Sequence, residues 1–211
     1  MNQFDPDEEG FPCMLDLEAS SFGPNSYPIE AAWSDDDGEI HRCLISPEVV
    51  PSWTDWSDES EAVHGIDRGR LLRNGWDPDY VAARIEENLG GKIVYSDAPD
   101  FDGRWLQPLF AVVDRPVPFA LEHIDELLIP MLRKPGELVY QAIQRIEELK
   151  AELQPKMAGR HAAGYDVGYL LALWRRARGE TVKMNHGVGP LPQSSPTGTF
   201  LPIRLRGSAN E

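Results

Sequence analysis

The chain has 211 residues, a length that suits one compact domain with short extensions. Hydrophobic residues make up 41% and charged residues 26%, as in ordinary globular proteins, and no apolar run approaches the length of a membrane span. The formal net charge of −15 argues against non-specific binding along a nucleic-acid backbone, which needs Lys and Arg, and suits a protein that binds cations.

The two ends of the chain differ in composition from its middle. Residues 1–10 are acidic with Pro and Gly, which predicts disorder, and they lack the basic start and apolar core of a signal peptide. We therefore expect a soluble, cytoplasmic protein with a folded domain over 11–183 and an extended tail over 184–211, rich in Gly, Pro and Ser. Cys13 and Cys43 have no His or second Cys at the spacing of a metal-binding motif, and they form no disulfide framework, so we expect buried, reduced thiols.

The folded part begins with three predicted strands, over 12–18, 27–33 and 39–45. Turn residues separate them: Gly23-Pro24-Asn25 between the first two, and Asp35-Asp36-Asp37-Gly38 between the second and third. Short turns join antiparallel strands, so the domain is predicted to open with an antiparallel meander.

Helices and strands alternate over the rest of the chain. A loop rich in Trp, Ser and Asp is predicted over 47–61, and the later elements are, in order, helix 68–73, helix 78–89, strand 92–95, helix 100–112, strand 119–121, helix 136–154 and helix 160–179. The short apolar strand 92–95 is predicted to be interior and parallel. This order predicts an α/β fold: a mixed sheet with helices packed on it.

The first strand carries two acids on one face. Side chains alternate along a strand, so Leu15 and Leu17 point one way while Asp16 and Glu18 point the other. Two unpaired carboxylates are costly to bury, and a divalent cation removes that cost because hard cations prefer carboxylate oxygens. The alternative is a solvent-facing edge strand with a polar face.

Two further acids fall on apolar helix faces. Asp102 lies three residues before Trp105 and four before Leu106, and Asp166 lies three before Tyr169 and four before Leu170. These spacings place each acid on the stripe that faces the core. Taken singly, each acid could instead cap a helix N-terminus.

Together, the four acids predict a binding site for two divalent ions, Mg²⁺ or Mn²⁺. A cluster of carboxylates cannot stay ionised without cations or proton uptake, and paired metal ions are typical of sites that cleave phosphodiesters. His161 lies five residues before Asp166 and titrates near neutrality, so it is the candidate general base.

These residues resemble the three motifs of the DEDDh 3′–5′ exonucleases, a superfamily that includes ribonuclease T, oligoribonuclease and the proofreading subunit of bacterial DNA polymerase III. The segments that carry the resemblance are Leu15-Asp16-Leu17-Glu18, Phe101-Asp102 and His161-Ala162-Ala163-Gly164-Tyr165-Asp166, with Val63-His64-Gly65-Ile66 also similar. The spacing of the histidine and the last aspartate is the most specific part. The resemblance spans roughly residues 12–178 and makes 11–183 the exonuclease domain.

The resemblance implies both a fold and an activity. The fold would be ribonuclease H-like, a mixed five-stranded sheet whose first three strands are antiparallel, flanked by helices. Asp16, Glu18 and Asp166 would hold the metal that activates water. Asp16 would also contact the second metal, with Asp102 supporting it through water, and His161 would act as the base. Nucleoside 5′-monophosphates would be released one at a time from a 3′ end.

The sequence departs from the family pattern at two places. The family usually has Thr-Gly or Ala-Gly after the first motif, where this chain has Ala19-Ser20-Ser21, and Ser96-Asp97 stands near the position of an upstream Asn. Asp97 and Asp100 are therefore rivals of Asp102 for the second motif.

The resemblance also implies how substrate is held. The backbone of Ala19, Ser20 and Ser21 would face the terminal sugar, and Phe22 would lie against the last base, unless Phe22 is an ordinary core or turn aromatic. His64 and Ile66 could line the same pocket.

The expected partners are 3′ ends of single-stranded DNA or RNA, or short oligonucleotides, because the acidic balance disfavours long duplexes. Relatives are often homodimers, so a dimer is possible; no membrane partner is expected. The alternative function is a catalytically silent ribonuclease H-like module that binds nucleic acid or a protein.

Overall fold

The computed structural model describes residues 10–153 and 162–182. His161 and the predicted tail over 184–211 lie outside the described residues, as do residues 1–9 of the N-terminal segment 1–10 that is predicted to be disordered.

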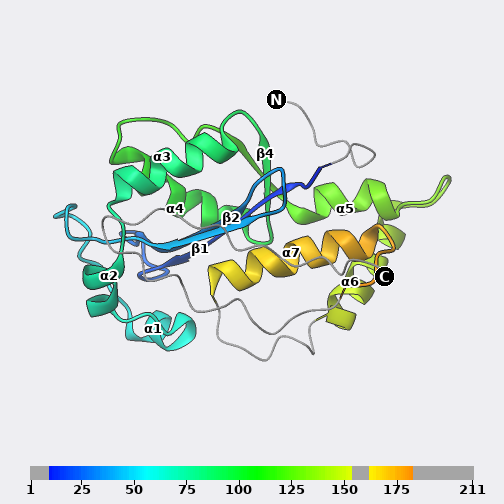
Figure 1. Ribbon diagram of the computed structural model, residues 1–211. Coiled ribbons are helices and arrows are strands. Elements are labelled where there is room, and N and C mark those ends of the chain that lie inside the picture. Colours follow the sequence, from blue (N-terminus) through cyan, green and yellow to red (C-terminus); the bar gives the residue numbers. More distant parts are fainter. Residues whose placement is uncertain (1–9, 154–161, 183–211) are drawn as a thin grey trace, which may run out of the picture.

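The core of the structure is a mixed five-stranded sheet (Figure 1). Its strands are β1 (Cys13–Ala19), β2 (Pro28–Ser34), β3 (Ile40–Leu44), β4 (Ile93–Ser96) and β5 (Ala120–His123). Their order is β3-β2-β1-β4-β5; β1, β2 and β3 pair antiparallel, whereas β4 runs parallel to both of its neighbours. This arrangement confirms the predicted α/β fold class, with three antiparallel strands followed by parallel ones.

Helices cover both faces of this sheet. They are α1 (Asp58–His64), α2 (Arg68–Asn74), α3 (Pro78–Leu89), α4 (Pro99–Ala111), α5 (Ile124–Leu132), α6 (Val139–Leu153) and α7 (Ala163–Ala177). Figure 1 shows α3 and α4 on one side of the strands and α7 along the other, with α5 and α6 beside α7. The sheet is therefore the middle of three layers.

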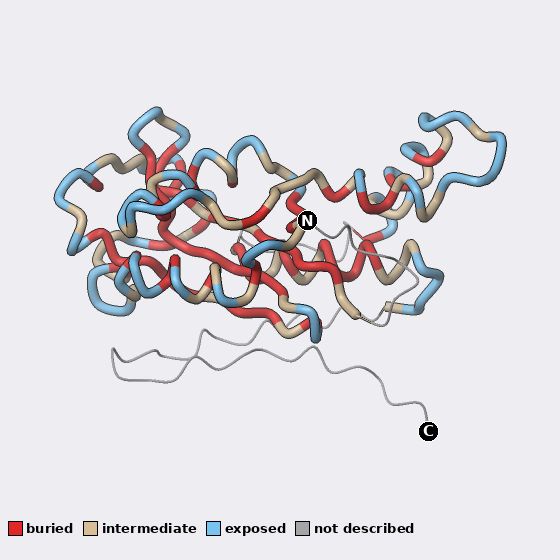
Figure 2. The backbone as a smooth tube through the Cα atoms, turned by 90° about the horizontal axis from the view of Figure 1, so that it is seen from above, coloured by how far each residue is buried: buried red, intermediate tan, exposed pale blue. Residues whose placement is uncertain are grey.

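Two hydrophobic clusters hold these layers together, one on each face. Leu15 and Leu17 of β1 belong to the cluster that includes α3 and α4, whereas Met14 belongs to the cluster that includes α5, α6 and α7. Strands β1 to β4 are mostly buried, whereas the edge strand β5 is half-buried along its length (Figure 2). Because side chains alternate along β1, Asp16 and Glu18 face the same side as Met14, towards α7.

Two helices were not predicted. Helix α1 lies in the segment expected to be a loop; the Ser57 side chain caps it by accepting a hydrogen bond from Ser60 N, and Gly65 ends it in the left-handed conformation. It buries only Ser60 and His64, so it has no apolar stripe to detect. Helix α5 contains Pro130, which argues against a helix in a sequence reading.

The predicted stripe of α6 is only partly buried. Ile146 and Leu153 lie in the core, but Val139 and Ile143 at the start of the stripe are exposed. The first turns of α6 therefore extend beyond the surface that α5 and α7 cover.

The remaining expectations concern thiols and membranes. Cys13 and Cys43 are both buried and unbridged, as predicted. Across the described ranges, every helix is too short or too polar to cross a membrane.

Gly75 is packed directly against backbone. A Cβ there would lie 2.5 Å from Ser46 N and 2.6 Å from Leu71 O, neither of which can move alone. We expect Gly75→Ala to lower the free energy of unfolding by about 1–3 kcal/mol, measured by urea denaturation. The matched control is Gly103→Ala within α4, where the nearest atom is a flexible leucine methyl at 3.9 Å. It should be neutral or stabilising by up to about 1 kcal/mol; equal losses in both variants would contradict the packing argument.

Candidate functional site

Three of the predicted acids meet at the end of β1. Asp16, Glu18 and Asp166 each offer a carboxylate oxygen, and these three oxygens lie within 4.8 Å of one another. Asp16 and Glu18 come from alternate positions of one strand, whereas Asp166 comes from the first turn of α7. All three side chains are partly buried. The structure thus brings Asp166 to two acids that lie 148 and 150 residues before it in the chain.

Asp102 lies beside this trio in a different environment. Its side chain is 1% exposed, and its two oxygens accept hydrogen bonds from Leu17 N, at 3.1 Å, and from the Ser96 hydroxyl. These bonds join the N-terminus of α4 to β1 and to the end of β4. The rival acids Asp97 and Asp100 are both exposed, so Asp102 is the buried one of the three candidates for the second motif.

The acid cluster holds more negative charge than its surroundings balance. Burial, and then the charges of Asp102, Asp166 and Glu18, raise the pKa of Asp16 well above its usual range. Burial and the neighbouring Glu30 raise the pKa of Glu18 to about 8. Burial also raises the pKa of Asp102 to about 7, against the lowering effect of its hydrogen bonds.

A divalent cation fits this arrangement. Partly buried carboxylates whose pKa values are raised by one another are stabilised by a positive charge between them. Their oxygens converge from three directions, and hard cations such as Mg²⁺ and Mn²⁺ take oxygen ligands. The cluster is therefore a candidate metal centre.

The raised pKa values predict how stability depends on pH without metal. Unfolded Glu18 loses its proton near pH 4.5, but in the folded protein it keeps that proton up to about pH 8. Between these values the folded state binds more protons than the unfolded state, so the free energy of unfolding should fall as pH rises from 4.5 to 8 and then level off. Thermal unfolding in chelator at pH 5, 6.5 and 8.5 measures this.

The matched variant for this measurement is Glu18→Gln, which does not titrate. Its unfolding temperature should fall less over the same pH range, and added Mn²⁺ should raise the unfolding temperature of the parent most at pH 8.5, where fewest protons must be displaced. Parallel pH profiles for parent and variant would contradict the assigned pKa shift.

The predicted substrate-binding segment after β1 is mostly buried. Ala19, Ser20 and Ser21 are inside the protein, and the Ser21 hydroxyl donates to Asp55 and accepts from Gly23 N. Ser20 O accepts a hydrogen bond from Ser57 N, at 3.0 Å. Because Ser57 caps α1, this bond ties the segment after β1 to the helix that carries His64.

His64 and Ile66 are also buried near this segment. Ile66 N donates to His64 Nδ1 at 3.1 Å, so the ring proton is on Nε2. That Nε2 is buried and makes no hydrogen bond within the described residues. Burial lowers the pKa of His64, so the ring is a neutral donor. The ring centroids of Trp56 and His64 lie 6.3 Å apart. A polar group bound beside Trp56 could accept a hydrogen bond from His64 Nε2.

Phe22 is the exposed member of the predicted set. It is 62% exposed and packs against Phe101 and Trp105 of α4, with ring centroids 5.6 Å and 5.9 Å away. The guanidinium of Arg104 lies 5.1 Å from the Phe101 ring, and its Nη2 donates to Phe22 O. We call Phe22, Phe101, Arg104 and Trp105 the aromatic patch. Phe101 directly precedes Asp102 in α4, so this apolar, cationic surface neighbours one of the predicted acids along the chain.

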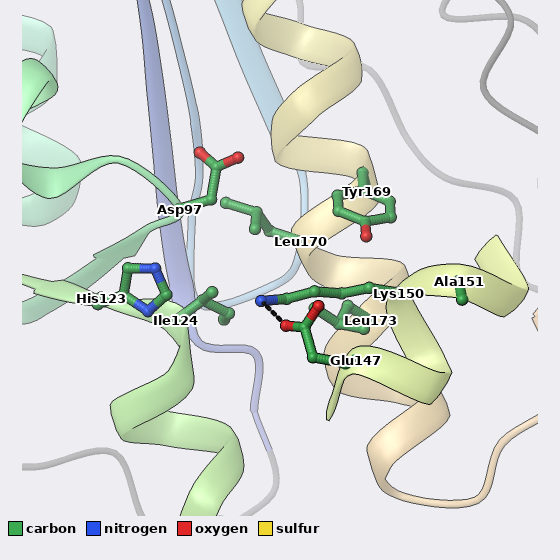
Figure 3. Close-up of a pocket in the computed structure, with 9 residues that line it drawn as sticks. All are labelled: Asp97, His123, Ile124, Glu147, Lys150, Ala151, Tyr169, Leu170 and Leu173. Atoms are coloured by element: carbon green, nitrogen blue, oxygen red, sulfur yellow. Dashed lines mark hydrogen bonds and ion pairs between the residues drawn. The ribbon is translucent and has the colours of Figure 1, made fainter. Parts of the chain in front are cut away.

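A polar cavity of about 320 Å³ is lined by residues of α6 and α7 and by residues at the ends of β4 and β5 (Figure 3). Asp97, His123, Glu147, Lys150 and Tyr169 contribute its polar groups, and Figure 3 shows Lys150 paired with Glu147 of the same helix. The Lys150 ammonium lies 2.9 Å from Glu147 and 3.4 Å from the carboxylate of Asp125. Its charge is thus already balanced, so the cavity offers no excess positive charge to a phosphate group.

Sequence reasoning missed one buried acid near the site. Glu30 of β2 is 0% exposed and lies opposite Glu18 in the β1–β2 register. Its Oε1 accepts hydrogen bonds from Arg42, and its Oε2 accepts one from Ala163 N. A detectable signal was present, because Glu30 is the one charged residue in an otherwise apolar predicted strand.

Comparison with known proteins supports the fold. No family model matches the chain, and no curated protein matches it. Solved structures of exonuclease I do match. The enzyme from Methylocaldum szegediense matches at 18% sequence identity with a TM-score of 0.53, and the Escherichia coli enzyme in complex with a dA16 oligonucleotide matches at 17% identity with a TM-score of 0.54. A zinc-bound complex of the E. coli enzyme with single-stranded DNA matches at 17% and 0.55.

The matches cover most of this chain but less than half of the matched proteins. They span 79–81% of this chain and 40–41% of the exonuclease I chains. At this identity they show a shared fold. The fold and the acid cluster together define the chain as a ribonuclease H-like α/β protein with a candidate metal centre.

Proposed function

We propose that this protein is a metal-dependent 3′–5′ exonuclease that releases nucleoside 5′-monophosphates from single-stranded or short nucleic acid. The observation that carries the proposal is the convergence of Asp16, Glu18 and Asp166 oxygens within 4.8 Å. The fold shared with exonuclease I, which has been solved with bound dA16 and dT13 oligonucleotides, supports single-stranded DNA as a substrate.

The metal ligands would be Asp16, Glu18 and Asp166, with Asp102 supporting a second ion. Two Mg²⁺ or Mn²⁺ ions would supply charge stabilisation at the phosphate and lower the pKa of the attacking water. Asp102 also keeps the end of β1 in place through its bond from Leu17 N. His161, which precedes Ala162 in the chain, would take the proton from the attacking water as general base.

The terminal nucleotide would lie between the segment after β1 and the aromatic patch. The backbone from Ala19 to Ser21 would face the sugar, and Phe22 would stack on the last base. The buried His64 Nε2–H is a neutral donor for that nucleotide, with Ile66 behind it. Stacking and a neutral donor suit a chain whose net charge of −15 disfavours broad contact with the phosphate backbone.

The first test is hydrolysis of 5′-labelled single-stranded DNA and RNA with Mg²⁺ or Mn²⁺. We expect a ladder that shortens from the 3′ end and disappears in chelator. Asp16→Asn should reduce the rate about 100-fold or more, because it removes part of the metal's charge stabilisation, which is worth several kcal/mol. The control is Asp100→Asn, which removes an exposed acid of the same charge in α4 and should leave the rate within about twofold.

The outcome of this test also decides the alternative. No shortening of either strand with either metal, from protein shown to be folded, would favour the silent module that binds nucleic acid or a protein partner.

A second test concerns Phe22. Loss of a stacking ring costs about 1–3 kcal/mol per base, so Phe22→Ala should raise KM for an oligonucleotide about 5- to 150-fold with a smaller change in kcat. Phe22→Trp should retain most of the affinity. Leu138→Ala removes an equally exposed apolar side chain (64% exposed) near α6 and should leave KM unchanged. An unchanged KM in Phe22→Ala would exclude stacking at this position.

A further inference from the structure

Helix α7, which carries Asp166, begins at a residue whose side chain cannot cap it, although Asp166 Oδ2 accepts a hydrogen bond from Ala162 N at 3.4 Å. Its N-cap is Ala162, whose methyl group cannot accept a hydrogen bond, and no side-chain cap is formed there. The first N–H groups of a helix need acceptors. Ala163 N finds one in Glu30 Oε2, at 2.9 Å and 133 residues away in the chain. The cap of α7 therefore comes from strand β2.

Glu30 is oriented by Arg42 on the neighbouring strand. Arg42 Nε and Nη2 lie 2.9 Å and 2.6 Å from Glu30 Oε1, and Glu30 is completely buried. A buried carboxylate is costly unless it is paired and fully hydrogen-bonded. Here one oxygen is bound by Arg42 and the other by the α7 backbone, so both oxygens have partners. We call Glu30 and Arg42 the clasp.

The clasp also packs against the first turn of α7. A Cβ at Gly164 would lie 2.7 Å from Arg42 Cδ, so only a glycine lets the helix approach the arginine this closely. One turn later Gly168 faces Ile40 of β3, where a Cβ would lie at an ordinary 3.6 Å. The tight contact is therefore specific to Arg42 and Gly164.

This contact lies close to the candidate metal ligands. Glu30 is the direct cross-strand partner of Glu18, so their side chains point to the same face of the sheet. Asp166 follows Ala163 by three residues, less than one helical turn, or about 4.5 Å along the axis. The position of the Asp166 carboxylate relative to β1 thus depends on where the first turn of α7 is held.

We propose that Glu30 and Arg42 are positioning residues for the metal centre: they hold the start of α7 so that Asp166 meets Asp16 and Glu18. The proposal rests on the metal-binding part of the proposed function, since it requires that the acid cluster bind divalent metal ions. Glu30 is not among the three acids whose oxygens converge, and the clasp acts through its contacts with Ala163 and Gly164.

The test is Mn²⁺ affinity of the whole protein, measured by calorimetry and by the electron paramagnetic resonance of free Mn²⁺. Loss of a residue that orients metal ligands typically lowers affinity about 10- to 100-fold, and we expect this range for Glu30→Ala. Glu30→Gln retains an acceptor for Ala163 N, so it should recover part of the affinity. KM for the oligonucleotide at saturating Mn²⁺ should change less than about twofold, because the aromatic patch is untouched.

Two control variants separate positioning from loss of stability. Glu137→Gln breaks another close ion pair, to Arg145 at 2.6 Å, at the start of α6 away from the cluster. It should leave Mn²⁺ affinity unchanged even if it lowers the unfolding temperature.

A further pair of variants, Gly164→Ala and Gly168→Ala, changes no polar side chain and tests the proposal if Glu30→Ala does not fold. Gly164→Ala should lower Mn²⁺ affinity by displacing Arg42 or the helix, whereas Gly168→Ala should not. Parent-like affinity in both folded Glu30→Ala and Gly164→Ala, or an equal loss in Glu137→Gln, would overturn the proposal.

The two proposals fail differently. If the parent binds Mn²⁺ but shortens no oligonucleotide, the nuclease is excluded while the clasp is still judged by the affinities of its variants. If the parent binds no Mn²⁺, there is no metal centre to position and both proposals are overturned.

Discussion

The site depends on one electrostatic constraint: three carboxylates converge within 4.8 Å in a partly buried position. Such a group is stable only when it takes up protons or binds cations, and the raised pKa values of Asp16 and Glu18 express that requirement. No single element can supply the convergence, because β1 and α7 come from opposite ends of the described chain. The sheet must therefore hold both in register, and the bonds Leu17–Asp102 and Glu30–Ala163 connect β1 to α4 and β2 to α7.

The charge of the protein shapes how a nucleic acid would be held. With a net charge of −15, attraction to phosphates over the whole surface is unfavourable. The groups proposed to hold the nucleotide instead include exposed aromatic rings, one arginine over the Phe101 ring and a neutral histidine donor. On the proposed function, affinity would come from stacking and from the metal ions at the cleaved end, which favours short contacts with a single strand over long contacts with a duplex.

Much of this could be predicted from local sequence. Alternation identified the face of β1 that carries Asp16 and Glu18, and helical spacing put Asp102 and Asp166 on inward faces, because both patterns depend on near neighbours. The aromatic patch could be predicted only in part. Phe22 was identified as a candidate, but Phe101 lies 79 residues away and no local sequence pattern predicts that the two rings pack together. Helix α1 escaped prediction because its start is set by a Ser57 cap and not by buried apolar residues. Sequence patterns indicate which face of a strand or helix is buried and where a helix is capped. They do not indicate which elements, far apart in the chain, pack against each other.

The clasp combines a local contact, between neighbouring strands, with a contact to a helix that is distant in the chain. Glu30 and Arg42 are 12 residues apart on paired strands, so their ion pair forms within the β2–β3 hairpin, where closing the loop costs little entropy. That pair fixes one Glu30 oxygen and leaves the other facing the region where α7 packs. The distant helix thus docks against an acceptor that is already oriented, which lowers the entropy lost when the last ligand of the cluster is brought to β1. The local structure of the β2–β3 hairpin in this way determines the position of Asp166, although Arg42 and Asp166 lie more than 120 residues apart in the chain.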